Sequence, residues 1–179
     1  MQYQTIIDFW FKEISPKQWW NKDSDFDHLI TQRFSDIYSK ATCGELFNWR
    51  VSAEGRLAEI IVLDQFSRNM FRDLPESFSQ DSVALVLAQE AIFNNADQTI
   101  PIEWRIFMYM PFMHSESLLI HEQAVKLFDQ KGIEGNLDFE KKHKVIIERF
   151  GRFPHRNKIL NRSSTAEELE FLKQPDSSF

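Results

Sequence analysis

Residues 57–71 read LAEIIVLDQFSRNMF, and this stretch decides the fold. A helix at about 100° per residue places one set of its side chains on a single face: Leu57, Ile60, Ile61, Asp64, Arg68 and Phe71. The opposite side is also apolar, because it carries Val62, Phe66 and Met70. A helix that is apolar all round lies inside a protein. We therefore predict that this helix is central and that Asp64 and Arg68 lie on a buried face.

The rest of the chain also reads as helix. Five Gly and six Pro interrupt it, and no alternation typical of strands lasts more than a few residues. The pattern predicts helices over about residues 5–14, 16–20, 25–41, 52–71, 81–93, 101–111, 115–130, 138–150 and 164–173. Pro111 is predicted to divide two helices and Gly135 to lie in a loop. Ser164 and Glu167 match a capping box for the last helix.

Short turns between successive helices favour antiparallel hairpins packed side by side. The chain has 179 residues and shows no shift in composition along its length. The sequence therefore predicts an all-α single domain over residues 1–179. Residues 174–179 follow the last predicted helix, and we expect this tail to fray.

Composition excludes several classes of function. The net charge is −6, so nucleic acid and anionic membranes would repel the chain as a whole. The lone Cys43 excludes an internal disulfide and a multi-cysteine metal site. No basic residue precedes the first apolar stretch, unlike in a secretory signal. The longest strongly apolar run, 60–63, is far below the ~20 residues that cross a bilayer. We expect a soluble cytoplasmic protein.

Ionisable side chains fall on apolar faces in several separate segments, and buried charges are costly unless they are paired. Asp64 and Arg68 are four residues apart, so they can meet on the central helix. Two interpretations stay open at this point. The pair either ties helices together or belongs to a ligand-binding site.

Three further residues are candidates for proton transfer: His114, Glu116 and His143. His114 and Glu116 lie next to Pro111 at a predicted helix start, and Glu116 shares a predicted apolar face with Leu119. His143 shares an apolar face with Ile146, Ile147 and Phe150. Imidazole and carboxylate could hold a metal ion, but the spacing gives no specific support, so we predict neither a metal nor a cofactor.

Residues 149–162 carry five basic side chains and no acidic one. Guanidinium groups suit planar carboxylate or phosphate partners, so this segment predicts an anion site. The predicted ligand-binding residues are Asp64, Arg68, Arg149, Arg152, His155, Arg156 and Asn157. The alternative is that these arginines bond helix carbonyls and the carboxylates of other helices.

Residues 63–72 read LDQFSRNMFR, 107–116 read FMYMPFMHSE, and 149–157 read RFGRFPHRN, with His143 before the last and SSTAEE at 163–168. In this order they resemble an uncharacterised family found mostly in bacteria, the domain-of-unknown-function 924 proteins. Ser67 stands where the family usually has Pro, and Met110 where Leu is common. The resemblance spans nearly the whole chain and implies a TPR-like stack of helical hairpins. It implies no established activity.

Three functions therefore compete. The first is binding of a small anionic ligand in an internal pocket of Arg, His, Asp and Glu side chains, with catalysis left open. The second is a non-enzymatic TPR-like module that binds a protein or peptide. In the third, the polar clusters are a structural ion-pair network.

Overall fold

The computed structural model describes residues 1–175, 177 and 178, and every regular element among them is a helix. The α-helices are α1 (Tyr3–Asp8), α2 (Ser24–Thr42), α3 (Ala53–Ile61), α4 (Ser67–Met70), α5 (Asp81–Phe93), α6 (Ile102–Met113), α7 (Leu118–Phe128), α8 (Glu134–Phe150) and α9 (Ala166–Phe171). Two π-helical turns cover Phe9–Glu13 and Val62–Phe66. Short 3₁₀ turns cover Pro16–Trp19, Phe47–Val51, Pro75–Phe78, Ala96–Thr99 and Pro154–Arg156.

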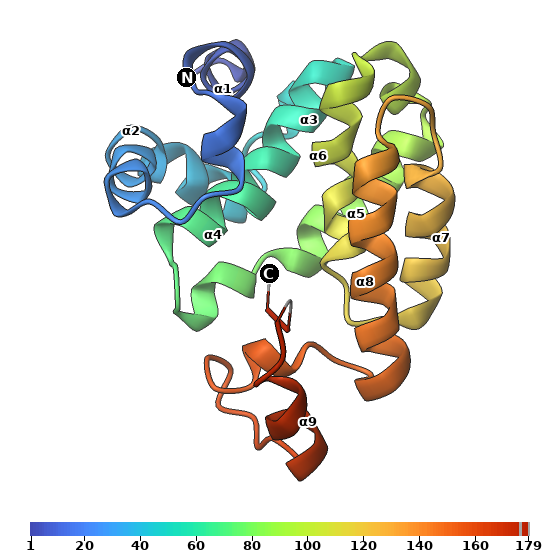
Figure 1. Ribbon diagram of the computed structural model, residues 1–179. Coiled ribbons are helices and arrows are strands. Elements are labelled where there is room, and N and C mark those ends of the chain that lie inside the picture. Colours follow the sequence, from blue (N-terminus) through green and yellow to red (C-terminus); the bar gives the residue numbers. More distant parts are fainter. Residues whose placement is uncertain (176, 179) are drawn as a thin grey trace.

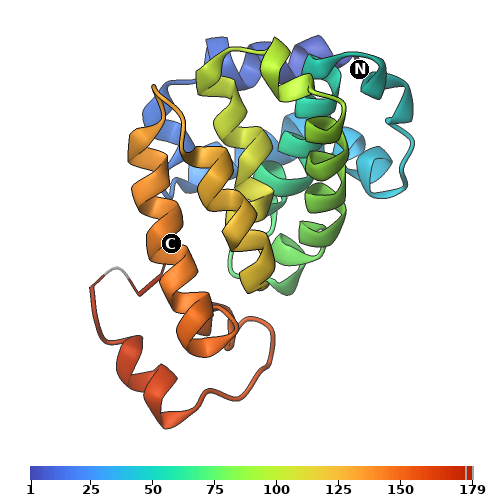
Figure 2. The same cartoon turned by 90° about the vertical axis from the view of Figure 1, so that its right-hand side faces the viewer.

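The helices form two groups that meet at the centre of the molecule (Figure 1). In the first, α1 packs on α3, and α2 packs on α4. In the second, each of α5, α6 and α7 packs on the next helix along the chain, ending at α8. The view from the side shows that α9 lies below α8, apart from both groups (Figure 2).

The segment 57–71 is the central element, as predicted. It runs without a break through α3, the π-helical turn and α4, and each residue from Leu57 to Ser67 is buried. The π-helical turn inserts a wider ring into the helix and contains Asp64, which is fully buried. Such turns break regular helical geometry and are frequent at functional sites.

Aromatic rings from four elements fill the core around this segment. The ring centroids of Phe34 and Phe66 are 4.9 Å apart, and those of Phe9 and Phe34 are 4.8 Å apart. Trp10 joins the two groups of helices, because it lies 5.6 Å from Phe66 and 5.5 Å from Phe107 of α6. Phe and Trp side chains, which are numerous in this sequence, therefore form much of the interior.

Several predicted helix boundaries differ from the structure. Pro111 lies inside α6, because it removes only its own N–H and the helix ends two residues later. The α8 helix begins at Glu134, so Gly135 lies in its first turn. The capping box of α9 pairs Thr165 with Glu168, one residue later than the predicted pair of Ser164 and Glu167.

The predicted apolar face of α7 was also wrong. This helix buries His121, Ala124 and Phe128, whereas Leu119 is 66% exposed. The buried face includes His121 because its imidazole finds hydrogen-bond partners inside the protein, Glu140 and the Ser115 carbonyl.

Beyond α8 the chain turns at Gly151, whose φ of 66° ends the helix as the sequence predicts. A small second apolar cluster of Ile146, Ile147 and Phe153 joins this C-terminal segment to α8. The tail expected to fray, 174–179, includes Asp176 and Phe179, which lie outside the described residues. Within the tail, Ser177 is buried and its hydroxyl donates to the Leu172 carbonyl. Fraying stays a prediction.

In the part of the chain that the structure describes, no helix has both the length and the apolar character needed to span a membrane.

Phe107→Ala should lower the free energy of unfolding by about 3–5 kcal/mol, because it leaves a cavity among the aromatic rings that link the two groups of helices. Denaturant unfolding followed by circular dichroism measures this change. Phe93→Ala is the matched control, since Phe93 is 86% exposed and should change stability by less than about 0.5 kcal/mol. Equal losses in the two variants would contradict the proposed packing.

Candidate functional site

A pocket of about 280 Å³ opens where α5 begins, where α6 connects to α7, and where the C-terminal segment crosses them. Its polar lining residues are Ser79, Asp81, Ser82, His114, Ser115, Glu116 and Arg156. Its apolar lining residues are Pro75, Phe78, Leu85, Pro111 and Leu160. The volume is near the lower end of the range for ligand sites. The pocket therefore suits a small molecule.

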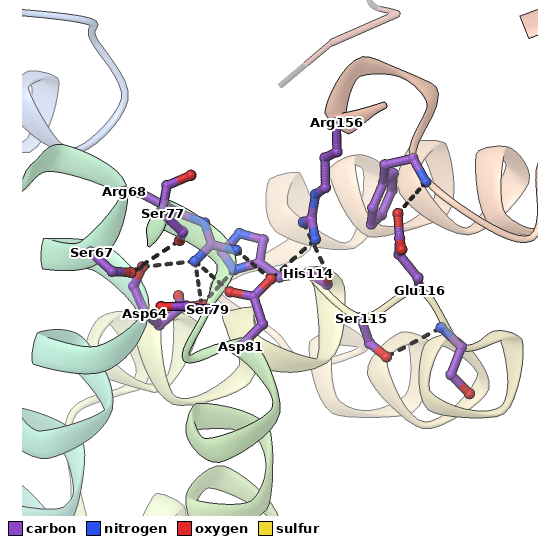
Figure 3. A network of polar contacts seen from close by, with 12 residues as sticks. Asp64, Ser67, Arg68, Ser77, Ser79, Asp81, His114, Ser115, Glu116 and Arg156 are labelled. Carbon is purple, nitrogen blue, oxygen red and sulfur yellow. Dashed lines mark hydrogen bonds and ion pairs between the residues drawn. The ribbon is translucent and has the colours of Figure 1, made fainter. Parts of the chain in front are cut away.

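Asp64 lies behind the pocket wall and is fully buried. Its Oδ1 lies 3.1 Å from Nη1 of Arg68 and 2.7 Å from Nδ1 of His114 (Figure 3). Burial by itself would raise the pKa of this carboxyl, but Arg68 and His114 outweigh burial and hold the pKa well below its usual range. Asp64 is therefore ionised inside the protein, where Arg68 and His114 both favour its charged form.

Asp81 is shared by two guanidinium groups. Its Oδ1 lies 2.9 Å from Nη1 of Arg68, and its Oδ2 accepts from Nη1 of Arg156 at 3.0 Å. Figure 3 shows this carboxylate between the two arginines. Asp81 thus links the central helix, α5 and the C-terminal segment in one network.

Arg156 is held rigidly in the pocket wall. Its guanidinium carbon lies 4.5 Å from the ring centroid of Phe78 and 4.7 Å from that of Phe153. Nη2 donates to the His114 carbonyl at 3.0 Å, while the buried Nε has no hydrogen-bond partner in the described part of the chain. Burial lowers the pKa of Arg156 to about 10, so it stays charged at neutral pH.

His114 presents an acceptor to the pocket. Because the Asp64 carboxylate can only accept, Nδ1 of His114 carries the proton between them. Burial, reinforced by Arg68, lowers the pKa of this imidazole, so the ring is neutral near pH 7. Its Nε2 then has a free lone pair, and the described residues offer that atom no hydrogen bond. A neutral imidazole oriented by a carboxylate is an arrangement suited to accept a proton.

Glu116 anchors the C-terminal segment. Its carboxylate accepts two hydrogen bonds from Arg162, at 2.6 and 2.9 Å, and one from the Phe153 N–H at 2.7 Å. Burial alone would raise the pKa of Glu116, but these donors lower it. Glu116 is therefore a paired anion that shapes the pocket wall.

Two helix N-termini also face this region. The α5 helix begins at Asp81 and α7 at Leu118, directly after the pocket residues Ser115 and Glu116. Neither N-terminus has a side-chain cap. Free N–H groups at such ends carry a partial positive charge.

The family model described as "Bacterial protein of unknown function (DUF924)" matches residues 6–176. The chain belongs to the DUF924 family. It is also similar to a solved structure, that of the protein of unknown function ATU0120 from Agrobacterium tumefaciens, with 39% sequence identity and a TM-score of 0.91. That match covers 96% of each chain. The comparison with curated proteins gave no match.

Only part of the predicted site of this DUF924 protein comes together at the pocket. His114, Glu116 and Arg156 line it, and Asp64 and Arg68 support it from behind. The first two were predicted as catalytic residues and the others as ligand-binding residues, and these roles stay predictions.

The remaining predicted residues do not line this pocket, because they have partners elsewhere. Arg149 pairs with Glu167 on the surface, and Arg152 pairs with Glu168. Asn157 donates to the Ser164 hydroxyl. His143 and His155 lie against the ring of Phe153, with centroids 5.7 and 5.6 Å away.

Two important residues were missed. Asp81 has no distinguishing signal in the sequence, because an acidic residue at a helix start is typical of ordinary capping. Arg162 belongs to the basic segment, but spacing alone could not show which arginine reaches Glu116. A metal alternative gains no support, because no group of three or more His, Cys, Asp or Glu among the described residues could hold an ion.

Arg68→Ala should destabilise this DUF924 protein by about 3–5 kcal/mol, because it leaves the buried Asp64 carboxylate without its cationic partner. The measurement is equilibrium unfolding in denaturant at neutral pH. Arg149→Ala removes the same side chain from an exposed pair and should have a small effect. A near-native Arg68→Ala protein would rule out a structural role for the network.

Acidification should destabilise the protein before its carboxylates titrate. Burial lowers the pKa of His143 to about 3 and that of His155 to about 4, whereas unfolded His titrates near about 6.5. The unfolded chain therefore binds protons first, so stability is complete above about pH 6.5 and falls below it. At pH 5 each such histidine should cost about 2 kcal/mol.

This pH effect can be measured by denaturant unfolding between pH 7 and pH 5. His143→Gln should make the dependence of unfolding free energy on pH shallower, because one buried titrating group is removed. Phe93→Ala, which changes an exposed side chain without a titrating group, should leave the dependence as in the wild type. An unchanged slope in His143→Gln would show that this imidazole does not resist protonation in the folded state.

Proposed function

We propose that the pocket binds a small molecule through a carboxylate or phosphate group, and that Arg156 is the residue that holds this group. The proposal is supported most directly by the surroundings of the Arg156 side chain. Its side chain is 8% exposed, lies between two aromatic rings and keeps an unpartnered Nε in a pocket wall. Arg156 also lines the pocket, and a guanidinium group suits the planar carboxylate or the phosphate of a small molecule.

The electrostatics of the surroundings support an anionic group. Three carboxylates in the network, Asp64, Asp81 and Glu116, are matched by the guanidinium groups of Arg68, Arg156 and Arg162. The first turn of α5 contains the carboxylate of Asp81, whereas the first turn of α7 has no acidic side chain, so the uncapped N-terminus of α7 adds partial positive charge. Such ends are favourable places for anions.

His114 gives the same site a proton acceptor, which supports catalysis as an extension of binding. Among the three predicted catalytic residues it fits best, because Asp64 orients it and its Nε2 is available. Glu116 is already engaged by Arg162, and His143 lies outside the pocket lining. The predicted cytoplasmic location also stays a proposal.

The second candidate function is a TPR-like module that binds a peptide or protein. A row of exposed apolar side chains on α5 favours it, since Val83 is 45%, Val86 60% and Phe93 86% exposed. Exposed apolar patches mark interaction sites. We rank it second because the pocket at the start of α5 combines a cavity with oriented polar groups.

A thermal-shift screen of carboxylates and phosphorylated metabolites tests the proposed function. A ligand at 100 times its dissociation constant should add about 2.7 kcal/mol of stability, and each kcal/mol raises the melting temperature by roughly 2–4 °C in a chain of this size. Arg156→Lys should lose most of the shift, because a lysine cannot reproduce the planar guanidinium between the two rings.

Arg149→Ala is the matched control and should keep the full shift, since Arg149 is exposed and pairs with Glu167 away from the pocket. A shift of equal size in Arg156→Ala, or silence across the panel with the wild-type protein, would contradict the proposal.

A further inference from the structure

We infer that the ligand of this pocket is a small zwitterion, with a carboxylate and an ammonium group close together and an aliphatic side chain, as in an aliphatic α-amino acid. The inference rests on the proposed function, because it takes Arg156 as the anchor of the carboxylate. Beyond the proposed function, the inference specifies three properties of the ligand: its second polar group, its net charge and its apolar part.

The pocket offers hydrogen-bond acceptors beside its one guanidinium group. Asp81 and Glu116 line it as carboxylates, and neutral His114 presents Nε2. Carboxylate oxygens and this Nε2 can only accept hydrogen bonds. Both carboxylates are paired with guanidinium groups of the protein, Asp81 with Arg68 and Arg156 and Glu116 with Arg162. An anion alone would add negative charge beside these carboxylates, whereas an ammonium group on the same ligand brings a compensating positive charge and three hydrogen-bond donors.

The charges of the network around the pocket balance one another. The three carboxylates and three guanidinium groups of the network cancel, and His114 is neutral. A ligand with a net charge would leave that charge uncompensated in a partly buried site, which is unfavourable. A phosphate dianion beside Asp81 and Glu116 would be repelled most. A zwitterion adds no net charge and pairs with both signs.

The remaining wall of the pocket is apolar. Phe78, Leu85 and Leu160 face the same cavity with apolar surface. At about 280 Å³ the cavity suits a small metabolite with one short apolar side chain. Burying that side chain against these residues adds a hydrophobic contribution that a purely polar ligand would lack.

The test compares three ligands that differ by one group each, by isothermal titration of the wild-type protein near pH 7. They are leucine, its deaminated analogue isocaproate and its decarboxylated analogue isopentylamine. We expect leucine to bind at least about tenfold more tightly than either analogue, because each analogue leaves one set of charged partners in the pocket without its counterpart.

The outcomes separate this inference from the proposed function. If isocaproate binds as tightly as leucine, the zwitterion inference is wrong and anion binding stands. If isopentylamine binds and neither acid does, the proposed function is wrong as well. If leucine fails to bind while other anions shift the melting temperature, the zwitterion inference is overturned alone.

A variant gives an independent readout of the ammonium partner. Asp81→Asn keeps the side-chain shape but removes the carboxylate between Arg68 and Arg156. The preference for leucine over isocaproate should fall by about fivefold or more, and affinity for isocaproate should rise. Glu167→Gln, which removes a negative charge outside the pocket lining, should preserve the preference. An unchanged preference in Asp81→Asn would overturn the inference, and the wild-type comparison decides it if that variant does not fold.

Discussion

The carboxylate of Asp64 is the constraint on which the rest of the structure depends. It lies in the most buried segment of the chain, where an unpaired charge would cost several kcal/mol. Arg68 from the next turn compensates this charge, and the neutral His114 at the end of α6 donates a hydrogen bond to it. Arg68 in turn needs Asp81, and Asp81 also pairs with Arg156. One buried charge thus sets a sequence of partners that runs from the central helix to the C-terminal segment.

The same sequence of partners shapes the pocket. Each of its polar walls comes from a different part of the chain: α5, the connection between α6 and α7, and the segment after Gly151. Structural pairing and ligand binding are therefore compatible here, because the pairs orient the groups that face the cavity. A network that only tied helices together would not require a neutral imidazole with an open acceptor at its edge.

The sequence predicts the interior well because burial follows from periodicity. The central helix, its Asp64–Arg68 pair and the all-helical fold are confirmed, and so is membership in the DUF924 family. Periodicity fails for α7, where buried His121 satisfies its polar atoms through long-range partners. It also cannot tell which arginine of 149–162 reaches which carboxylate. Arg149 and Arg152 pair locally with α9, whereas Arg156 and Arg162 cross to the pocket, and these partners lie up to 75 residues away.

Arg156 follows the main core in the sequence, and this order affects which part of the protein can pack first during synthesis. A ribosome synthesises the protein from its N-terminus, and the side chains of the main core cluster all lie before residue 138. That core can form while Asp81 and Glu116 are still hydrated and the cavity has only two walls. The segment after Gly151 emerges later and completes the network, so the main core can pack before the third wall of the pocket is in place.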